Sequence, residues 1–131
     1  IADGGELIII APGIYKFGED EEIDRLIRKY GYRGTEKTLK SLHNNRELEE
    51  NISAAAHLIH GSSEGRFKIS LASPQLSLKE VEGINFNYLD YQKTIDKYNI
   101  EELENGFNNV NQEEIFYINN PATGLWIYRD K

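Results

Sequence analysis

Apolar and polar residues follow either a strand or a helix period over most of the chain. Leu7–Ile10 form a continuous apolar run between a Gly pair and Pro12, which is typical of a short strand buried on both faces of a parallel sheet. Residues 66–73 instead place apolar side chains at every second position, so a second, half-buried strand is predicted there.

Three helices are predicted between these two strands. Residues 18–31 carry apolar side chains three and four positions apart, with acids at the start and Arg and Lys near the end, as the helix dipole favours. Residues 34–45 form a second helix with Thr35 as its N-cap. Residues 46–60 form the third, with one apolar stripe made by Leu48, Ile52, Ala55, Ala56 and Ile59.

After the second strand, the pattern returns to short helices and ends in strands. Ser77 precedes Glu80 at the spacing of a capping box, which predicts a helix ended by Gly83. Residues 84–91 favour a strand that leads into a helix over 91–106.

Two β-rich runs, residues 113–121 and 124–130, flank the turn sequence "NPATG" and predict an antiparallel hairpin, with Trp126 as a packing residue. The alternation of strands and helices predicts an α/β fold with a mainly parallel sheet, flanking helices and this C-terminal antiparallel hairpin. Residues 1–131 are expected to form a single domain.

Composition excludes several classes of function. Cysteine is absent, which removes disulfides, thiolate metal ligands and cysteine nucleophiles. The net charge is −7 and 15 basic residues are dispersed among 22 acids, so binding to a phosphate backbone is not expected. The longest apolar run is too short to cross a bilayer and no signal segment is recognisable, which predicts a soluble, cytoplasmic protein. The chain lacks Met and is interpreted as a fragment of a longer protein.

Two histidines at helical spacing, His57 and His60, raise the question of a metal site. Such a site needs a third ligand, and the remaining histidine, His43, belongs to a different predicted helix. The favoured interpretation is therefore a pair of histidines at the border of the core, with His60 stabilised by the negative end of the helix dipole. No metal site is predicted.

The segment Gly61–Arg66 is rich in hydrogen-bond donors. Phosphate-binding loops open a helix, whereas this segment closes one, so the favoured interpretation is Gly61 as a left-handed C′ residue followed by a turn. Loops at the ends of sheet elements also collect ligands in open α/β folds. A small-anion site therefore remains a second interpretation, with a residue set of His57, His60, Ser62, Ser63 and Arg66.

Several segments together resemble the C-terminal domain of the lactate racemase-like family: "DGGELIIIAPGI", "AAAHLIHGSSEGRF", "INFNYLD" and "EEIFYINNPATGLWIYRD". The resemblance implies a two-domain enzyme that interconverts stereoisomers of a 2-hydroxy acid with a nickel pincer nucleotide. It also implies that the cofactor lysine and the catalytic histidines belong to a separate N-terminal domain, so no catalytic residue is carried over to this chain. The resemblance also implies that this domain forms a wall of the substrate cleft. Relatives often have an aromatic residue near position 52, so Ile52 implies a substrate other than lactate.

Three hypotheses follow. In the first, this chain is the C-terminal domain of a 2-hydroxyacid racemase or epimerase, lines or closes the substrate cleft with its N-terminal partner domain, and alone binds neither nickel nor substrate appreciably. In the second, it is an autonomous module for a small anion or a nucleotide. In the third, it is an interaction domain whose exposed tyrosines face another subunit.

Overall fold

The computed structural model describes residues 3–18, 20–120 and 124–129. Along the chain its elements are β1 (Glu6–Ile10), α1 (Glu21–Tyr30), α2 (Thr35–Asn44), α3 (Arg46–Glu49), α4 (Ile52–His60), β2 (Lys68–Ala72), α5 (Leu78–Gly83), β3 (Asn87–Tyr88), α6 (Tyr91–Tyr98), a 3₁₀ turn (Ile100–Glu102), β4 (Gly106–Val110), β5 (Glu113–Asn120) and β6 (Gly124–Arg129). No helix within these ranges is long and apolar enough to span a membrane.

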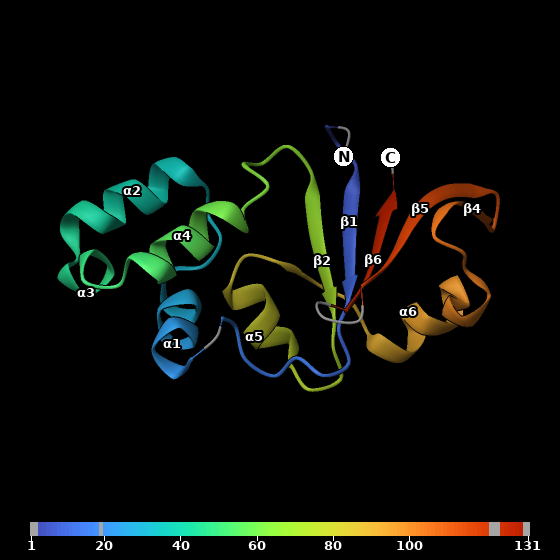
Figure 1. The fold of residues 1–131 in the computed structure, drawn as a ribbon, viewed down its shortest axis with the longest axis horizontal. Coiled ribbons are helices and arrows are strands. Elements are labelled where there is room, and N and C mark those ends of the chain that lie inside the picture. The colour runs from blue at the N-terminus through green and yellow to red at the C-terminus, as the bar shows by residue number, and fades with distance from the viewer. Residues whose placement is uncertain (1–2, 19, 121–123, 130–131) are drawn as a thin grey trace.

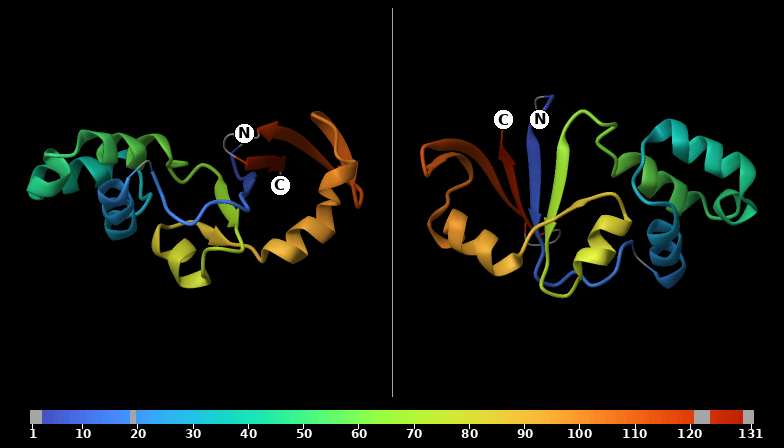
Figure 2. Two further views of the ribbon diagram at one scale, coloured as in Figure 1. Left: turned by 60° about the horizontal axis from the view of Figure 1, so that its bottom comes forward. Right: turned by 180° about the vertical axis from the view of Figure 1, so that it is seen from behind.

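The strands form one mixed sheet in the order β3-β2-β1-β6-β5-β4. Strands β1, β2 and β3 are parallel, while β6 pairs antiparallel with both β1 and β5, and β5 pairs antiparallel with β4. Helices α1 to α4 gather beyond one side of the sheet, and α6 lies with β4 and β5 on the other (Figure 1). The two further views in Figure 2 keep these groups at opposite ends of the molecule. The predicted α/β class and the C-terminal hairpin are confirmed.

Strand β1 contributes to a core on each face of the sheet. Ile8 and Ile10 are buried on the face that packs against α6 and β5, in a cluster completed by Ala72, Tyr98, Ile115 and Tyr117. Ile9 packs on the opposite face against the cluster of the helical end, which contains Leu26, Ile27, Leu48, Leu58 and Leu71. A continuous apolar run is required because both faces of this strand are covered.

Helix α1 agrees closely with its prediction, and α2 corrects one detail. Asp20 caps α1 by accepting a hydrogen bond from the amide of Ile23 (2.8 Å), and the helix ends at Gly31. The N-cap of α2 is Gly34, so the predicted N-cap Thr35 is wrong: Thr35 is the first helical residue. The Glu64 carboxylate, in the loop after α4, accepts the hydrogen bonds of Thr35 instead.

The helix predicted over residues 46–60 is interrupted. Glu50 and Asn51 separate α3 from α4, and the Asn51 side chain caps α4 by accepting from the amide of Ala54 (3.1 Å). This break rotates the apolar stripe, so Ile52 is 63% exposed while Leu58 is fully buried. Asn51 favours a new cap over a continued helix because its short amide competes for backbone donors.

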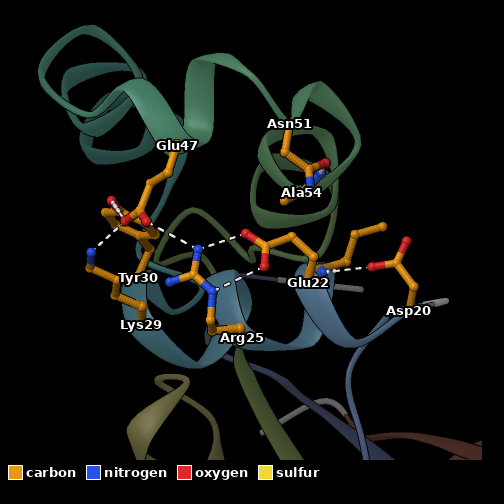
Figure 3. Close-up of polar contacts among 9 residues, drawn as sticks. Asp20, Glu22, Arg25, Lys29, Tyr30, Glu47, Asn51 and Ala54 are labelled. Atoms are coloured by element: carbon orange, nitrogen blue, oxygen red, sulfur yellow. Dashed lines mark hydrogen bonds and ion pairs between the residues drawn. The ribbon is translucent and has the colours of Figure 1, made fainter.

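Charged side chains connect α1 to α3 (Figure 3). The Glu47 carboxylate accepts hydrogen bonds from Lys29, from the Tyr30 hydroxyl (2.7 Å) and from Arg25 (3.1 Å), and Arg25 also pairs with Glu22 (2.6 Å). These bonds, first that of Lys29, lower the pKa of Glu47 to about 2. The cluster holds the short helix α3 against the end of α1.

The second half of the chain confirms some predictions and corrects others. The capping box of Ser77 and Glu80 is present at the start of α5. The helix predicted over 91–106 ends early, because Asn99 adopts the left-handed conformation (φ 52°). Strand β4, at residues 106–110, was not predicted. The hairpin turn at 121–123 and the side chain of Trp126 lie outside the described residues and side chains.

Candidate functional site

Helix α4 and the loop that joins it to β2 contain all five residues of the predicted anion site. His57 is half-buried and His60 is exposed, one turn apart at the end of α4. Within the described ranges, no group of three or more His, Asp or Glu side chains is placed to hold a metal ion. The partial burial of His57 and the exposure of His60 place the two histidines at the border of the core.

Gly61 ends α4 in a way that differs from the prediction. Its backbone is right-handed (φ −82°, ψ −3°), so the predicted left-handed C′ conformation is wrong. A Cβ at this position would lie 2.4 Å from the Tyr32 ring, which explains the glycine by close approach rather than by backbone freedom. The left-handed residues of the loop are instead Glu64 (φ 56°) and Gly65 (φ 76°).

Most polar groups of the loop take part in contacts that join elements of the fold. The Ser62 hydroxyl accepts from the amide of Glu64 (3.1 Å). The Glu64 carboxylate accepts from the amide of Thr35 (2.9 Å) and from its hydroxyl (2.5 Å), so this distant loop caps α2. Arg66 pairs with Asp3 (2.8 Å). These contacts fix the loop against α2 and against the start of β1.

The loop lies at the amino edge of the parallel strands because it leads into β2. In open α/β folds, ligands bind at the carboxyl edge of the parallel strands, which in this sheet is the edge where the chain leaves β1 and β2. There the two loops are tied together: the Ser73 hydroxyl donates to the carbonyl of Ile14 (2.8 Å), and the Gln75 amide donates to the carbonyl of Pro12 (2.8 Å). The predicted residues are therefore on the opposite edge from the usual ligand crevice.

A hollow of about 430 Å³ opens at this amino edge, beside the edge strand β3. Of the five predicted residues only Ser63 lines it, and its walls are completed by Tyr32, Gly65, Phe67, Lys68, Ile69, Glu82, Asn85, Phe86 and Asn87. Tyr32 and Phe86 stack face to face, with ring centroids 4.6 Å apart. Burial raises the pKa of Tyr32 to about 12, so its phenol stays protonated at neutral pH.

Sequence reasoning missed most of this lining. Tyr32 follows α1, whereas Asn85 and Phe86 come just before β3 and Asn87 is its first residue, so the two walls are more than fifty residues apart in the chain. The local sequence signal for the wall made by Asn85, Phe86 and Asn87 is the polar–aromatic alternation in "INFN", which by itself predicts only a strand. Contacts between distant segments are set by strand order, which a single sequence does not reveal.

Comparison with known proteins gives little beyond the fold. No family model matches this sequence, and no curated protein matches it. Among solved structures, it is similar to the crystal structure of a protein from Thermotoga maritima, a structural genomics target, with 26% identity and a TM-score of 0.58. The similarity covers 71% of this chain and 24% of that one, so the matched region is about a quarter of the relative's length.

Proposed function

We propose that this chain is the cleft-lining domain of a 2-hydroxyacid racemase or epimerase of the lactate racemase-like kind, working with a separate catalytic domain. Its role is to supply a wall of the substrate cleft and to keep water from the reacting centre. The reacting groups belong to the partner domain in this proposal.

The exposure of Ile52 is the observation that carries the proposal. The resemblance assigns this position to the substrate side of the domain, and Ile52 stands 63% exposed at the first turn of α4. The break after α3 is what turns this residue away from the core. An outward apolar side chain at this position agrees with the cleft wall that the resemblance implies.

Two further observations favour this proposal over an autonomous anion-binding module. The similar Thermotoga protein contains the matched region as about a quarter of its chain. The loop that was considered for anion binding has Glu64 and Arg66 in contacts with α2 and with Asp3, as expected for a structural connection.

The nickel pincer nucleotide is assigned to the other domain in this proposal. Nickel sites in proteins use imidazole among their donors. His57 and His60 are joined by no third ligating side chain in the part of the chain that the structure describes, so this donor set does not fit.

The test uses the longer protein that carries this domain, loaded with its cofactor. It is expected to interconvert the stereoisomers of a 2-hydroxy acid. Chiral chromatography measures this interconversion. The variant Ile52→Tyr is expected to shift kcat/KM towards smaller hydroxy acids by about tenfold, because the larger ring fills space beside the substrate. The 131-residue chain alone is expected to turn over nothing. Tight, stoichiometric nickel binding by this chain, or unaided turnover, would contradict the proposal.

A further inference from the structure

Strand β3 covers only part of the outer edge of β2. It pairs with β2 through two residues, of which the first, Asn87, lies opposite Ser70. Strand β2 begins two residues earlier, at Lys68. The chain before β3 is bonded to α5 instead, because the N–H of Phe86 donates to the carbonyl of Val81 (3.3 Å). Within the described residues, the first part of β2 therefore has β1 on one side and no strand on the other.

The backbone groups at this uncovered edge can be assigned from the hydrogen bonds of their neighbours. Successive residues of a strand direct their N–H and C=O groups to opposite sides. The N–H of Lys68 donates to the carbonyl of Gly5 on the β1 side (3.0 Å), whereas the carbonyl of Leu71 accepts from the chain after β3 (3.1 Å). Phe67 and Ile69 thus direct their backbone groups to the β3 side. Because β3 begins one residue further along, the N–H of Ile69 and both groups of Phe67 have no strand residue opposite them in the described part of the chain.

These backbone groups face the hollow at the amino edge. Phe67 and Ile69 line this hollow from β2, and Asn85 and Phe86 line it from the chain before β3. Its volume of about 430 Å³ lies in the range of small-ligand sites. The walls keep out the edge of another folded sheet, whereas a single extended chain can enter. An uncovered strand edge pairs most readily with such a chain.

Aromatic side chains lie on one side of this edge. Leu71 belongs to the core of the helical end, and Phe67 and Ile69 share its face of the sheet because side chains alternate along a strand. Tyr32 and Phe86, which stack on each other, pack against the same core. A strand added along residues 67–69 directs every second side chain to this face, where apolar side chains meet the aromatic rings.

The charge of the surroundings favours a basic ligand. Glu82 lines the hollow and forms no ion pair with any residue that the structure describes. Lys68, the other charged residue of the lining, lies 4.0 Å from the Glu6 carboxylate, which offsets its charge. The whole chain has a net charge of −7, so its field also attracts a positively charged partner.

We propose that the edge of β2 at residues 67–69 binds an extended, positively charged peptide segment of another protein as an added parallel strand. The peptide residue opposite Lys68 donates its N–H to the carbonyl of Phe67 and accepts from the N–H of Ile69, which are the bonds that a longer β3 would make. The side chains on either side of that residue are apolar and contact Tyr32 and Phe86. This site is separate from Ile52, since it lies beyond the other end of α4.

The experiment is a titration of the isotopically labelled 131-residue chain with the peptide acetyl-Lys-Val-Thr-Val-Lys-amide, followed by amide chemical shifts. Saturable shifts are expected at residues 67–69 and 85–87, together with slower hydrogen exchange of the Ile69 N–H. Methylation of the backbone nitrogen of the central Thr removes the donor to Phe67 and is expected to weaken binding about tenfold. Methylation at the nitrogen of the second Val, which faces away from β2, is the matched control and is expected to leave binding unchanged.

Two variants test the contribution of charge. Glu82→Gln is expected to weaken binding of this basic peptide about threefold, as the loss of an exposed ion pair predicts. Glu101→Gln makes the same change of charge in the exposed turn after α6 and is expected to have no effect. Equal weakening by the two variants would contradict the place given to Glu82.

Several outcomes of the titration would overturn the proposal. One is the absence of saturable shifts, and another is equal weakening by methylation at Thr and at Val, since the backbone would then not be paired as a strand. Tighter binding of adenosine than of the peptide at the same amides would assign the hollow to a nucleobase. A shift of the Ile69 amide with protein concentration alone would assign this edge to a second copy of the chain.

Discussion

Gly61 and Tyr32 meet where α4 ends, and their contact shows how one residue position depends on a distant side chain. The backbone of Gly61 is in the ordinary helical region, so any residue could adopt it. What excludes a side chain is the Tyr32 ring, which also stacks on Phe86 beside the amino-edge hollow. The requirement for glycine is therefore tertiary in origin.

Gly61→Ala is expected to destabilise the chain by about 1–3 kcal/mol, because the new methyl group forces the Tyr32 ring to move. The measurement is the urea midpoint at neutral pH. Gly83→Ala is the control: nothing lies within 4 Å of its added Cβ, and it is the last residue of α5. That variant is expected to be neutral or stabilising by up to about 1 kcal/mol. Equal stability of Gly61→Ala and wild type would contradict the packing described for Tyr32.

At the scale of elements, α3 is a helix of four residues that depends on its neighbours for stability. Helices this short are unstable alone, since the nucleation of a helix is unfavourable. Leu48 anchors α3 in the core, and Glu47 connects it to Lys29, Tyr30 and Arg25 on α1 (Figure 3). The position of α3 in turn sets where α4 begins, and hence the exposure of Ile52.

The Glu47 cluster predicts a stability change in acid. The folded-state pKa of Glu47 is lowered from 4.5 to about 2, so the unfolded chain takes up this proton at a higher pH than the folded one. Glu47 therefore stabilises the fold fully above about pH 4.5, and this contribution is lost as the pH falls towards 2. The difference in urea midpoint between wild type and Glu47→Gln is expected to shrink over this range.

Glu50→Gln provides the comparison for this prediction. Glu50 pairs with Arg46 on the exposed side of α3, where both side chains are largely in solvent. Because exposed pairs contribute little, this variant is expected to match wild type at every pH in the series. A Glu47→Gln difference that stays constant down to pH about 2 would show that the cluster is not formed as described.

At the scale of the whole molecule, the sheet joins two cores. Strand β1 supplies Ile9 to the helical end and Ile8 and Ile10 to the end that contains α6 and β5. Neither core is complete without this strand. Because the same short run is buried on both faces, loss of one core exposes part of the other, and the two ends are expected to unfold together.

This coupling predicts coincident unfolding transitions at the two ends. The sequence has one tryptophan, in β6, so its fluorescence follows the antiparallel end. Far-ultraviolet circular dichroism follows chiefly the helices α1 to α4. The two urea midpoints are expected to agree within error, and Ile10→Ala is expected to lower both equally, by about 2–5 kcal/mol in free energy of unfolding. Separate midpoints would mean that the ends are independent units.

The sequence by itself determined the features that depend on local periods and on caps. The apolar run of β1, the helix predicted within residues 18–31, the capping box at Ser77 and the C-terminal hairpin all follow from neighbouring residues, and the structure confirms them. The sequence-based predictions are wrong where the local signal is weak or fits two structures equally well. Asn51 starts a new helix and Asn99 ends one where the apolar spacing could have continued, and "GFNNV" lacks the apolar content that would mark β4.

Tertiary structure alone decided the order of the strands and everything that depends on it. It placed the Ser62–Arg66 loop at the amino edge, brought Tyr32 against Gly61, and set Glu64 as the cap of α2. It also aligned Glu6, Ser70 and Asn87 across three strands and faced them with α6. The physical reason is that local hydrogen bonds fix an element within a few residues, whereas its neighbours are selected by burial of apolar faces across the whole chain.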